Sequence, residues 1–167
     1  MTIKIGDRIP DATLTESTEF GEACPVAPTK ISVAEAIKGK RIVIFALPGA
    51  YTPTCSSKHV PGYLAALDEL KAKKIDEVWC VAVNDGYVMA AWGRDQKAIG
   101  KIRMLGDGAA DFTKKLGLEV DLSGGGMGIR SQRYSMLVDD GVVKQLNVEA
   151  AGKFEVSDAA TMLKQVS

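Results

Sequence analysis

One cysteine of this sequence stands in a setting that suits nucleophilic chemistry. Cys55 ends the segment PGAYTPTC, which lies between an apolar run and an amphipathic stretch. We expect it in the first turn of a helix that begins at the carboxyl end of a strand, a common place for sites in open α/β sheets. Free amide groups and the positive end of the helix dipole stabilise a thiolate there. The sequence therefore predicts a reactive thiol at Cys55 rather than a packed one.

Two neighbours of Cys55 could assist it. Thr52 precedes the cysteine by three residues, so its hydroxyl could donate to the thiolate or to an oxygen bound beside it. It could also be only a helix cap, a role for which Thr54 is an equally good candidate. Pro48 ends the strand, and its ring can limit water at the site. The small residues Gly49 and Ala50 would let the loop backbone approach a substrate.

The remaining cysteines and the single histidine suggest structural roles. Taken singly, Cys24 and Cys80 are interpreted as small buried apolar residues. His59 is the only histidine, and we expect a structural or interface residue rather than a catalytic base. The three cysteines form no CxxC pair, which argues against a disulfide framework, a zinc site and a thioredoxin-type oxidoreductase. GxSxG is absent, which argues against a serine hydrolase.

Composition excludes several classes of partner. The chain has 167 residues, 21 basic and 21 acidic, and a formal net charge of zero. It therefore offers no field for nucleic acid or an anionic membrane surface. No apolar run approaches the ~18 residues of a membrane helix, and the start lacks the apolar stretch of a secretory signal. We expect one domain over residues 1–167 and a cytoplasmic protein.

The elements around Cys55 form a βαβ unit. Residues 41–47 and 77–83 are apolar and rich in β-branched side chains, as in parallel strands buried on both faces. Between them, residues 55–74 have the periodicity of an amphipathic helix. Pro61 lies inside this helix and removes a backbone donor, so a kink or break is expected near His59.

The rest of the chain completes a mixed α/β architecture. A cap at Asn84 and Asp85 predicts a helix to about Gly93, followed by a strand at 102–105 and a helix at 109–116. Residues 133–138 and 142–148 predict a β-hairpin around Asp-Gly. Ser157 is expected to cap a last helix that runs to about residue 166. Together these elements predict a central mixed β-sheet with helices on both faces.

The residues also carry a family resemblance. PGAYTPTCSSKHVPGY resembles the active-site signature of peroxiredoxins, specifically the type 5 or plant type II subfamily. The segments DELKAKKIDEVWCVAVNDGYVMAAWG, LGLEVDLSGGGMGIRSQRYSMLVDDGVV and LNVE are similar to that subfamily too, so the resemblance extends from about Ile5 over nearly the whole chain. It implies a thioredoxin-like fold, a homodimer, and a cysteine-dependent peroxidase for hydrogen peroxide and organic hydroperoxides that needs no heme, flavin or metal cofactor.

The resemblance also implies roles for individual residues. Cys55 would be the peroxidatic cysteine, which a peroxide converts to a sulfenic acid, with Thr52 and Pro48 as its partners. A distant arginine from GIRSQRY would hold the thiolate and a peroxide oxygen with its forked guanidinium. We assign this role to Arg130 rather than Arg133.

Reduction of the sulfenic acid leaves alternatives open. Cys80 matches a cysteine that resolves the sulfenic acid in plant type II relatives, but Trp79 and Val81 flank it in a strand, which predicts burial. The other route uses glutathione with glutaredoxin, or thioredoxin, acting in trans. We favour glutathione slightly, because Cys55 is expected at an exposed helix start. A different function for the same residues is a peroxide-sensing, partner-binding module with Cys55 as its switch.

Overall fold

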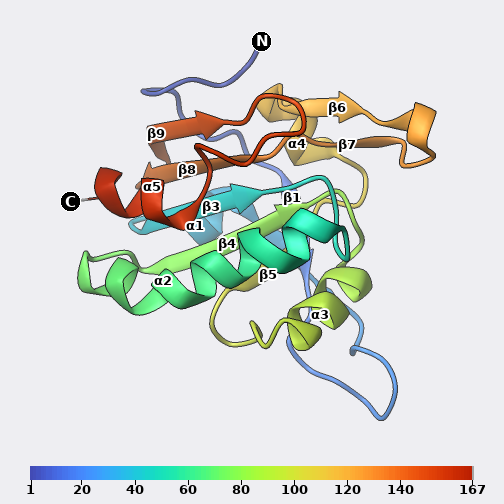
Figure 1. The fold of residues 1–167 in the computed structure, drawn as a ribbon. Helices are drawn as coiled ribbons and strands as arrows, with labels where there is room; N and C mark the ends of the chain where they lie inside the picture. Colours follow the sequence, from blue (N-terminus) through green and yellow to red (C-terminus); the bar gives the residue numbers. More distant parts are fainter. Residues whose placement is uncertain (167) are drawn as a thin grey trace.

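The computed structural model describes residues 1–166, and its main feature is a seven-stranded mixed sheet. The strand order is β2-β1-β5-β4-β3-β8-β9, and β6 and β7 form a separate two-stranded sheet (Figure 1). β3, β4 and β5 run parallel, whereas β1 and β8 join them antiparallel. The strands are β1 Thr13–Glu16, β2 Thr29–Ser32, β3 Arg41–Ala46, β4 Glu77–Ala82, β5 Arg103–Gly106, β6 Glu119–Asp121, β7 Ile129–Ser131, β8 Tyr134–Asp139 and β9 Val142–Val148.

The central strands are buried on both faces, as their uniform apolarity predicts. Alternate side chains enter two separate cores: Phe45 and its partner Cys80 pack on one face, and Ile44 and its partner Trp79 pack on the other. The predicted parallel pairing of these strands is confirmed, and each ends one residue before its predicted end. The sheet therefore carries helices on both sides.

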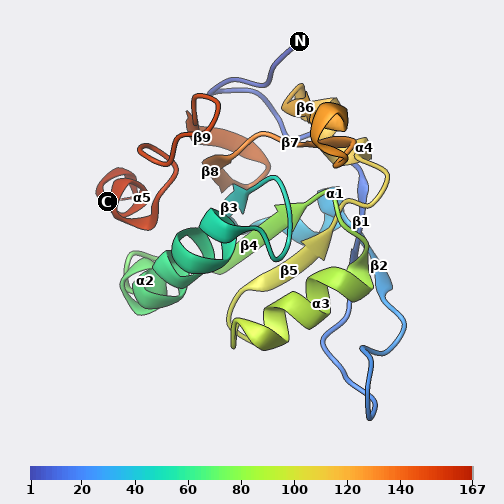
Figure 2. The same ribbon diagram turned by 45° about the vertical axis from the view of Figure 1, so that its right-hand side comes forward.

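Helices cover the two faces unequally (Figure 2). α2, α3 and α5 contribute side chains to the core around Phe45, and α1 and α4 contribute to the core around Trp79. This arrangement is the thioredoxin-like fold predicted from the sequence. The helices are α1 Val33–Ile37, α2 Val60–Ala72, α3 Gly86–Asp95, α4 Asp111–Leu116 and α5 Ala159–Gln165, with a short 3₁₀ turn at Ser123–Gly125. None of the helices in residues 1–166 is long and apolar enough to cross a membrane.

The predicted helix over 55–74 has two parts. Its first turn is a π-helix, Cys55–His59, in which the Val60 amide donates to the Cys55 carbonyl, and α2 follows directly. Pro61 has no amide proton and occupies the first turn of α2, where none is required. The irregularity expected near His59 is thus a wide turn rather than a break, and π-turns of this kind are common at functional sites.

The C-terminal hairpin and helix follow the sequence closely. Asp140 and Gly141 have φ values of 45° and 84°, the left-handed pair that a tight hairpin turn requires. The predicted cap of the last helix is off by one residue: Asp158 accepts the Thr161 amide, so it is the N-cap. The Ser157 hydroxyl instead donates to the Glu149 carboxylate.

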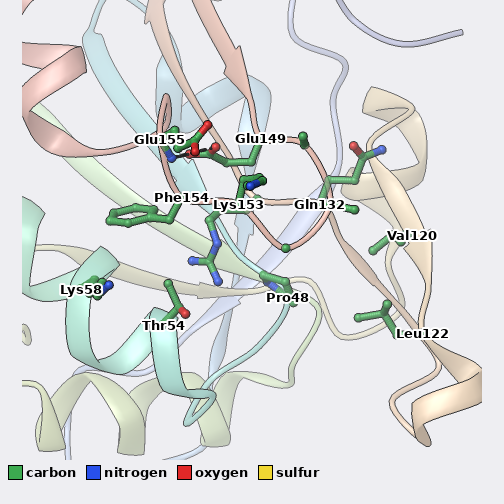
Figure 3. A pocket seen from close by; sticks show the side chains of 14 residues that line it. Pro48, Thr54, Lys58, Val120, Leu122, Gln132, Glu149, Lys153, Phe154 and Glu155 are labelled. Atoms are coloured by element: carbon green, nitrogen blue, oxygen red, sulfur yellow. Dashed lines mark hydrogen bonds between the residues drawn. The ribbon is translucent and has the colours of Figure 1, made fainter.

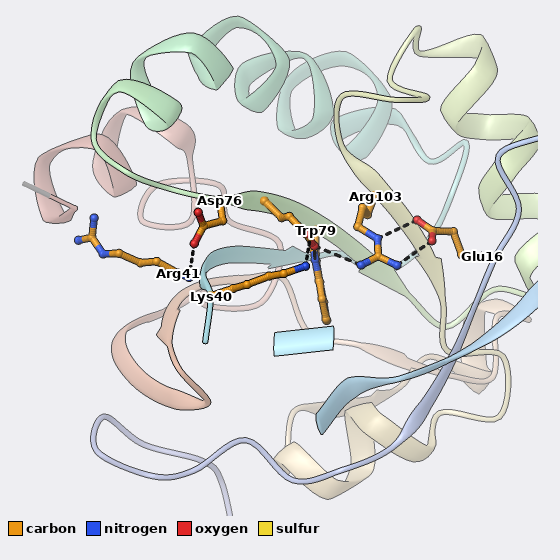
Figure 4. A network of polar contacts seen from close by, with 7 residues as sticks. Glu16, Lys40, Arg41, Asp76, Trp79 and Arg103 are labelled. Atoms are coloured by element: carbon orange, nitrogen blue, oxygen red, sulfur yellow. Dashed lines mark hydrogen bonds and ion pairs between the residues drawn. The ribbon is translucent and has the colours of Figure 1, made fainter. Parts of the chain in front are cut away.

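A charge network closes the amino ends of the parallel strands (Figure 4). Arg103 donates to both carboxylate oxygens of Glu16, at 3.0 and 2.8 Å, and to Glu77 at 3.1 Å. Lys40 and the Trp79 indole also donate to Glu77, at 2.7 and 2.9 Å. Each charge here has an opposite partner, so this end of the sheet is electrostatically satisfied.

Candidate active site

Cys55 lies at the opposite end of the sheet, just beyond the loop that leaves β3. It is the first residue of the π-turn, as expected for a site at a strand's carboxyl end. Its side chain is fully buried, so the expectation of an exposed helix start is wrong. The Trp92 indole from α3 donates to the Ser56 hydroxyl at 3.1 Å and holds this turn against the core. A reagent therefore reaches the sulfur only through an opening in the surrounding loops.

Arg133 is the arginine that contacts the thiol. Its Nη2 lies 3.1 Å from Cys55 Sγ. Arg133 immediately precedes β8, whose first residue Tyr134 pairs with Ala46 at the end of β3. This register places residue 133 level with the start of the loop that leads from β3 to Cys55.

Arg130, the arginine chosen from the sequence, makes different contacts. It lies in β7 of the small sheet, where its Nε donates to the Met127 carbonyl at 2.9 Å and its Nη1 donates to the Pro48 carbonyl at 3.0 Å. The predicted contact of Arg130 with the thiol is therefore replaced by one with the loop backbone. Gly49 leaves room for this guanidinium, since a Cβ there would lie 2.5 Å from Arg130 Nη1.

His59 supports Arg133 from behind. Arg133 Nη1 lies 2.9 Å from His59 Nδ1, and His59 Nε2 lies 3.1 Å from the Ser157 carbonyl oxygen. Because a guanidinium only donates and a carbonyl only accepts, these contacts assign the tautomer with its proton on Nε2. Burial, and then the charge of Arg133, lower the pKa of His59 from 6.5 to about 3. The ring is therefore a neutral support rather than a base, in agreement with its predicted structural role.

The loop before Cys55 is anchored at three consecutive residues. Arg130 holds the Pro48 carbonyl, the Thr52 hydroxyl donates to the Gly49 carbonyl at 2.8 Å, and the Ala50 amide donates to Asn84 Oδ1 at 2.9 Å. Thr52 therefore cannot donate to the thiolate as expected, and its hydroxyl offers lone pairs to the site instead. The Ala50 amide is likewise already used by Asn84, so it is no free donor for a substrate.

A cavity of about 470 Å³ opens beside Arg133 (Figure 3). Apolar side chains from three regions line it, including Pro48, Leu122 and Phe154, and Lys58 lies at its edge. The loop after β9 forms one wall through residues 149–155. This cavity leads from the surface to the guanidinium that holds Cys55 Sγ.

The other cysteines are placed differently from each other. Cys80 is fully buried in β4, in the same core cluster as Cys55, and all three cysteines are free. Burial, and then the proximity of Cys55, raise the pKa of the Cys80 thiol. Cys24 is exposed, so its interpretation as a buried apolar residue is wrong. It lies in the long connection between β1 and β2, where its carbonyl accepts the Gly21 amide.

Within residues 1–166, no three His, Cys, Asp or Glu side chains gather closely enough to hold a metal ion.

Comparison with known proteins identifies relatives over the whole chain. A family model described as Redoxin matches residues 4–163. The chain is 44% identical over 165 residues to Peroxiredoxin-2E, chloroplastic, of Arabidopsis thaliana, covering 98% of this chain and 69% of that protein.

Solved structures of Prx3 from Vibrio vulnificus allow a finer comparison. Reduced Prx3 in complex with H₂O₂ is 48% identical, with a TM-score of 0.91 and coverage of 99% of this chain and 100% of that one. Oxidized Prx3 is 50% identical, with a TM-score of 0.86 and coverage of 98% and 99%. At similar identity, the backbone of this chain thus lies nearer to the reduced form.

Proposed function

The chain belongs to the peroxiredoxin family of thiol-dependent peroxidases, and we propose that Cys55 is its peroxidatic residue, with hydrogen peroxide and organic hydroperoxides as substrates. The observation that carries this proposal is the 3.1 Å contact between Arg133 Nη2 and Cys55 Sγ. A permanent positive charge at that distance favours the thiolate, which is the nucleophilic form. Cys24 is exposed and Cys80 is buried among apolar side chains, so neither offers a comparable setting.

The reaction follows from the positions of these groups. The Cys55 thiolate attacks the terminal oxygen of the hydroperoxide, the new S–O bond forms as the O–O bond breaks, and both electrons of that bond leave with the other oxygen. The sulfur becomes a sulfenic acid, and the leaving oxygen takes a proton and departs as water or an alcohol. Negative charge therefore moves from sulfur to oxygen during the step.

Arg133 and Thr52 are suited to this movement of charge. The guanidinium of Arg133 is forked, so the same group that holds sulfur can donate to a peroxide oxygen as charge develops there. The Thr52 hydroxyl, whose proton is directed to Gly49, can accept the hydroperoxide's own proton in a hydrogen bond. Pro48 walls the cavity without adding a donor. Donors fixed in advance in this way typically account for a large share of catalysis.

Arg130 is assigned a positioning role. It reaches the Pro48 carbonyl rather than the sulfur, and so fixes the loop that carries Thr52. Asn84 acts on the same loop through the Ala50 amide.

The reductant is proposed to be glutathione with glutaredoxin, with thioredoxin as the other route. Cys80 pairs within β4 to strands on both sides, so it cannot move toward Cys55 without disrupting the sheet. Resolution by Cys80 would require Cys55 to leave its π-turn. A small thiol can instead approach through the cavity beside Arg133 once the turn loosens. Homodimer formation and a cytoplasmic location remain part of the proposal by family resemblance and composition.

Stopped-flow measurement of peroxide consumption tests this function directly. The reduced protein should consume hydrogen peroxide and an organic hydroperoxide stoichiometrically, with a sulfenic acid on Cys55 in the mass spectrum. Catalytic turnover should follow when glutathione and glutaredoxin are added, and comparison with thioredoxin identifies the better reductant. Stoichiometric oxidation without turnover by either system would favour the peroxide-sensing module instead.

A further inference from the structure

A buried carboxylate, Glu149, lies in the wall of the cavity beside Arg133. Glu149 follows β9 directly and is only 7% exposed. Its oxygens accept the backbone amides of Glu155, Val156 and Ser157 at 2.8 to 2.9 Å, and the Ser157 hydroxyl at 2.7 Å. One side chain thus gathers the far end of the loop 149–157. Burial opposes its charge, but these hydrogen bonds outweigh burial and lower the pKa of Glu149.

Ser157 is bound to Glu149 through two hydrogen bonds, and it also supports His59. Ser157 gives Glu149 both its amide and its hydroxyl, and its carbonyl oxygen accepts from His59 Nε2 at 3.1 Å and from the Tyr63 hydroxyl at 3.0 Å. A shift of Ser157 would therefore withdraw the acceptor that orients the His59 ring. All three side chains are buried, so water cannot easily substitute for the lost partner.

The same loop contacts the arginine at two further points. The Glu149 amide donates to the Arg133 carbonyl at 2.9 Å, which ties the loop's first residue to the arginine's backbone. The Phe154 ring lies 5.8 Å from the Arg133 guanidinium and 5.0 Å from the His59 ring, centre to centre for the rings. The loop thus contacts Arg133 at the backbone carbonyl and at the guanidinium, and it acts on the Nη1 nitrogen of Arg133 through His59.

We infer that Glu149 is a positioning residue for peroxide reduction, which holds Arg133 Nη2 on Cys55 Sγ through Ser157 and His59. This inference rests on the proposed function of Cys55. The arginine must keep Nη1 on histidine for Nη2 to face sulfur, because the guanidinium is rigid and its two nitrogens move together. Glu149 fixes that orientation without approaching the reacting atoms.

The test compares variants of the loop in the full chain. Glu149→Ala removes the anchor, Glu149→Gln keeps its shape with one acceptor oxygen, and Ser157→Ala removes only the hydroxyl contact. The matched control is Asp158→Ala, which removes the N-cap of α5 beside the same loop but leaves the contacts of Glu149 in place. For each variant, stopped-flow kinetics give the rate constant of Cys55 oxidation, and iodoacetamide alkylation as a function of pH reports thiolate formation.

A positioning role predicts a specific pattern. Glu149→Ala should slow oxidation by about 10- to 100-fold, the scale expected when reacting groups are misplaced by about 1 Å. Glu149→Gln and Ser157→Ala should lie between it and the wild type, and the alkylation profile should shift to higher pH in the same order. Asp158→Ala should lower the melting temperature while leaving both readouts near wild type.

A double-mutant cycle separates this role from general loop stability. If Glu149 acts through Arg133, Glu149→Ala should add little to the loss already caused by Arg133→Ala. Additive losses, or readouts in Glu149→Gln and Ser157→Ala that match those of Asp158→Ala, would overturn the inference. Should Glu149→Ala fail to fold, the other two variants decide by the same criteria. Failure of the proposed function is distinct, because then the wild type itself would not form a sulfenic acid on Cys55.

Discussion

The two ends of the parallel strands each carry a half-buried arginine, and their partners differ. At the amino ends, Arg103 bonds to two carboxylates, and Glu77 in turn receives Lys40 (Figure 4). At the carboxyl ends, Arg133 faces a thiol and a neutral histidine. Among residues 1–166, no carboxylate lies within ion-pair distance of Arg133. The first charge is already neutralised, whereas the second remains available to a thiolate and to a developing oxyanion.

The difference shows that burial of a charge does not by itself identify a site. The pKa of Arg103 is raised, mainly by its side-chain hydrogen bonds to Glu16. A raised pKa of this kind indicates a structural ion pair whose charges are already satisfied. Arg133 is oriented by neutral groups, which fix its direction without cancelling its charge. A functional cation is thus distinguished by the kind of partner it has, and the following predictions test that distinction.

The largest effect should come from the sulfur. Cys55→Ser should abolish peroxide consumption, because an alcohol is a far weaker nucleophile than a thiol and cannot form a sulfenic acid. Circular dichroism should show an intact fold, since the change is nearly isosteric. Residual consumption near the wild-type rate would remove Cys55 from the mechanism.

Alanine substitutions of Arg133 and Arg103 should then separate an effect on activity from an effect on stability. Arg133→Ala should slow sulfenic acid formation by about 10²- to 10³-fold, the usual cost of losing an oxyanion donor. Arg103→Ala is the matched control, and should lower the free energy of unfolding by roughly 1 to 3 kcal/mol with little change in that rate. Rates from stopped-flow fluorescence and unfolding in urea would test both; equal rate losses in the two variants would contradict the contrast.

Acid should weaken the Arg133 end of the sheet before the Arg103 end. His59 is the only histidine, with a pKa lowered from 6.5 to about 3 by burial and by Arg133. Below pH 6.5 the unfolded chain binds a proton at His59 that the native state does not bind. The contribution of His59 to stability is therefore complete above that pH and falls as the pH drops toward 3. Between about pH 7.5 and about pH 5 we expect a loss of about 2 kcal/mol.

Urea unfolding at several pH values measures this loss. His59→Gln should flatten the dependence, because it removes the group that titrates. The Arg103 end should not contribute in this window: although burial acts to raise the pKa of Glu77, hydrogen bonds from Lys40, Trp79 and Arg103 lower it overall. A slope that persists in His59→Gln would assign the effect elsewhere.

Arg130→Ala should have a smaller effect than Arg133→Ala. Arg130 acts on the Pro48 carbonyl and not on the sulfur, so a loss of about tenfold is expected from a loosened loop. Arg130→Lys should restore part of it, since one donor can still reach that carbonyl. If Arg130→Ala slowed sulfenic acid formation more than Arg133→Ala, the two roles would have to be exchanged.

The smallest effect on turnover should come from the second buried thiol. Cys80→Ser should cost about 1 kcal/mol of stability, as is typical of a single core substitution, and leave turnover with glutathione and glutaredoxin within about twofold of wild type. Mass spectrometry should find a glutathione adduct on Cys55 in this variant. Absence of the adduct together with loss of turnover would make Cys80 the resolving residue.

Much of the architecture was predictable from local pattern. The apolar runs of β3 and β4, the Asp85 cap of α3 and the Asp-Gly hairpin each follow from a few neighbouring residues. β1, β2 and α1 were not predicted: they have four or five residues each, and β2 is only partly buried. Elements that short are stabilised by pairing with distant strands, which periodicity cannot show.

The sequence by itself determined where Cys55 lies, at a helix start after a strand, because the strand, the Pro- and Thr-rich loop and the helix start are contiguous. Only the tertiary structure decided which arginine serves it. Arg130 and Arg133 are both permanent cations three residues apart, and their local sequences do not distinguish them. The antiparallel register of β8 against β3 brings Arg133 to the sulfur, and residues from the loop 149–157 hold it there. The contact between Arg133 and Cys55 joins residues 78 positions apart, so it depends on the closed fold rather than on any local pattern.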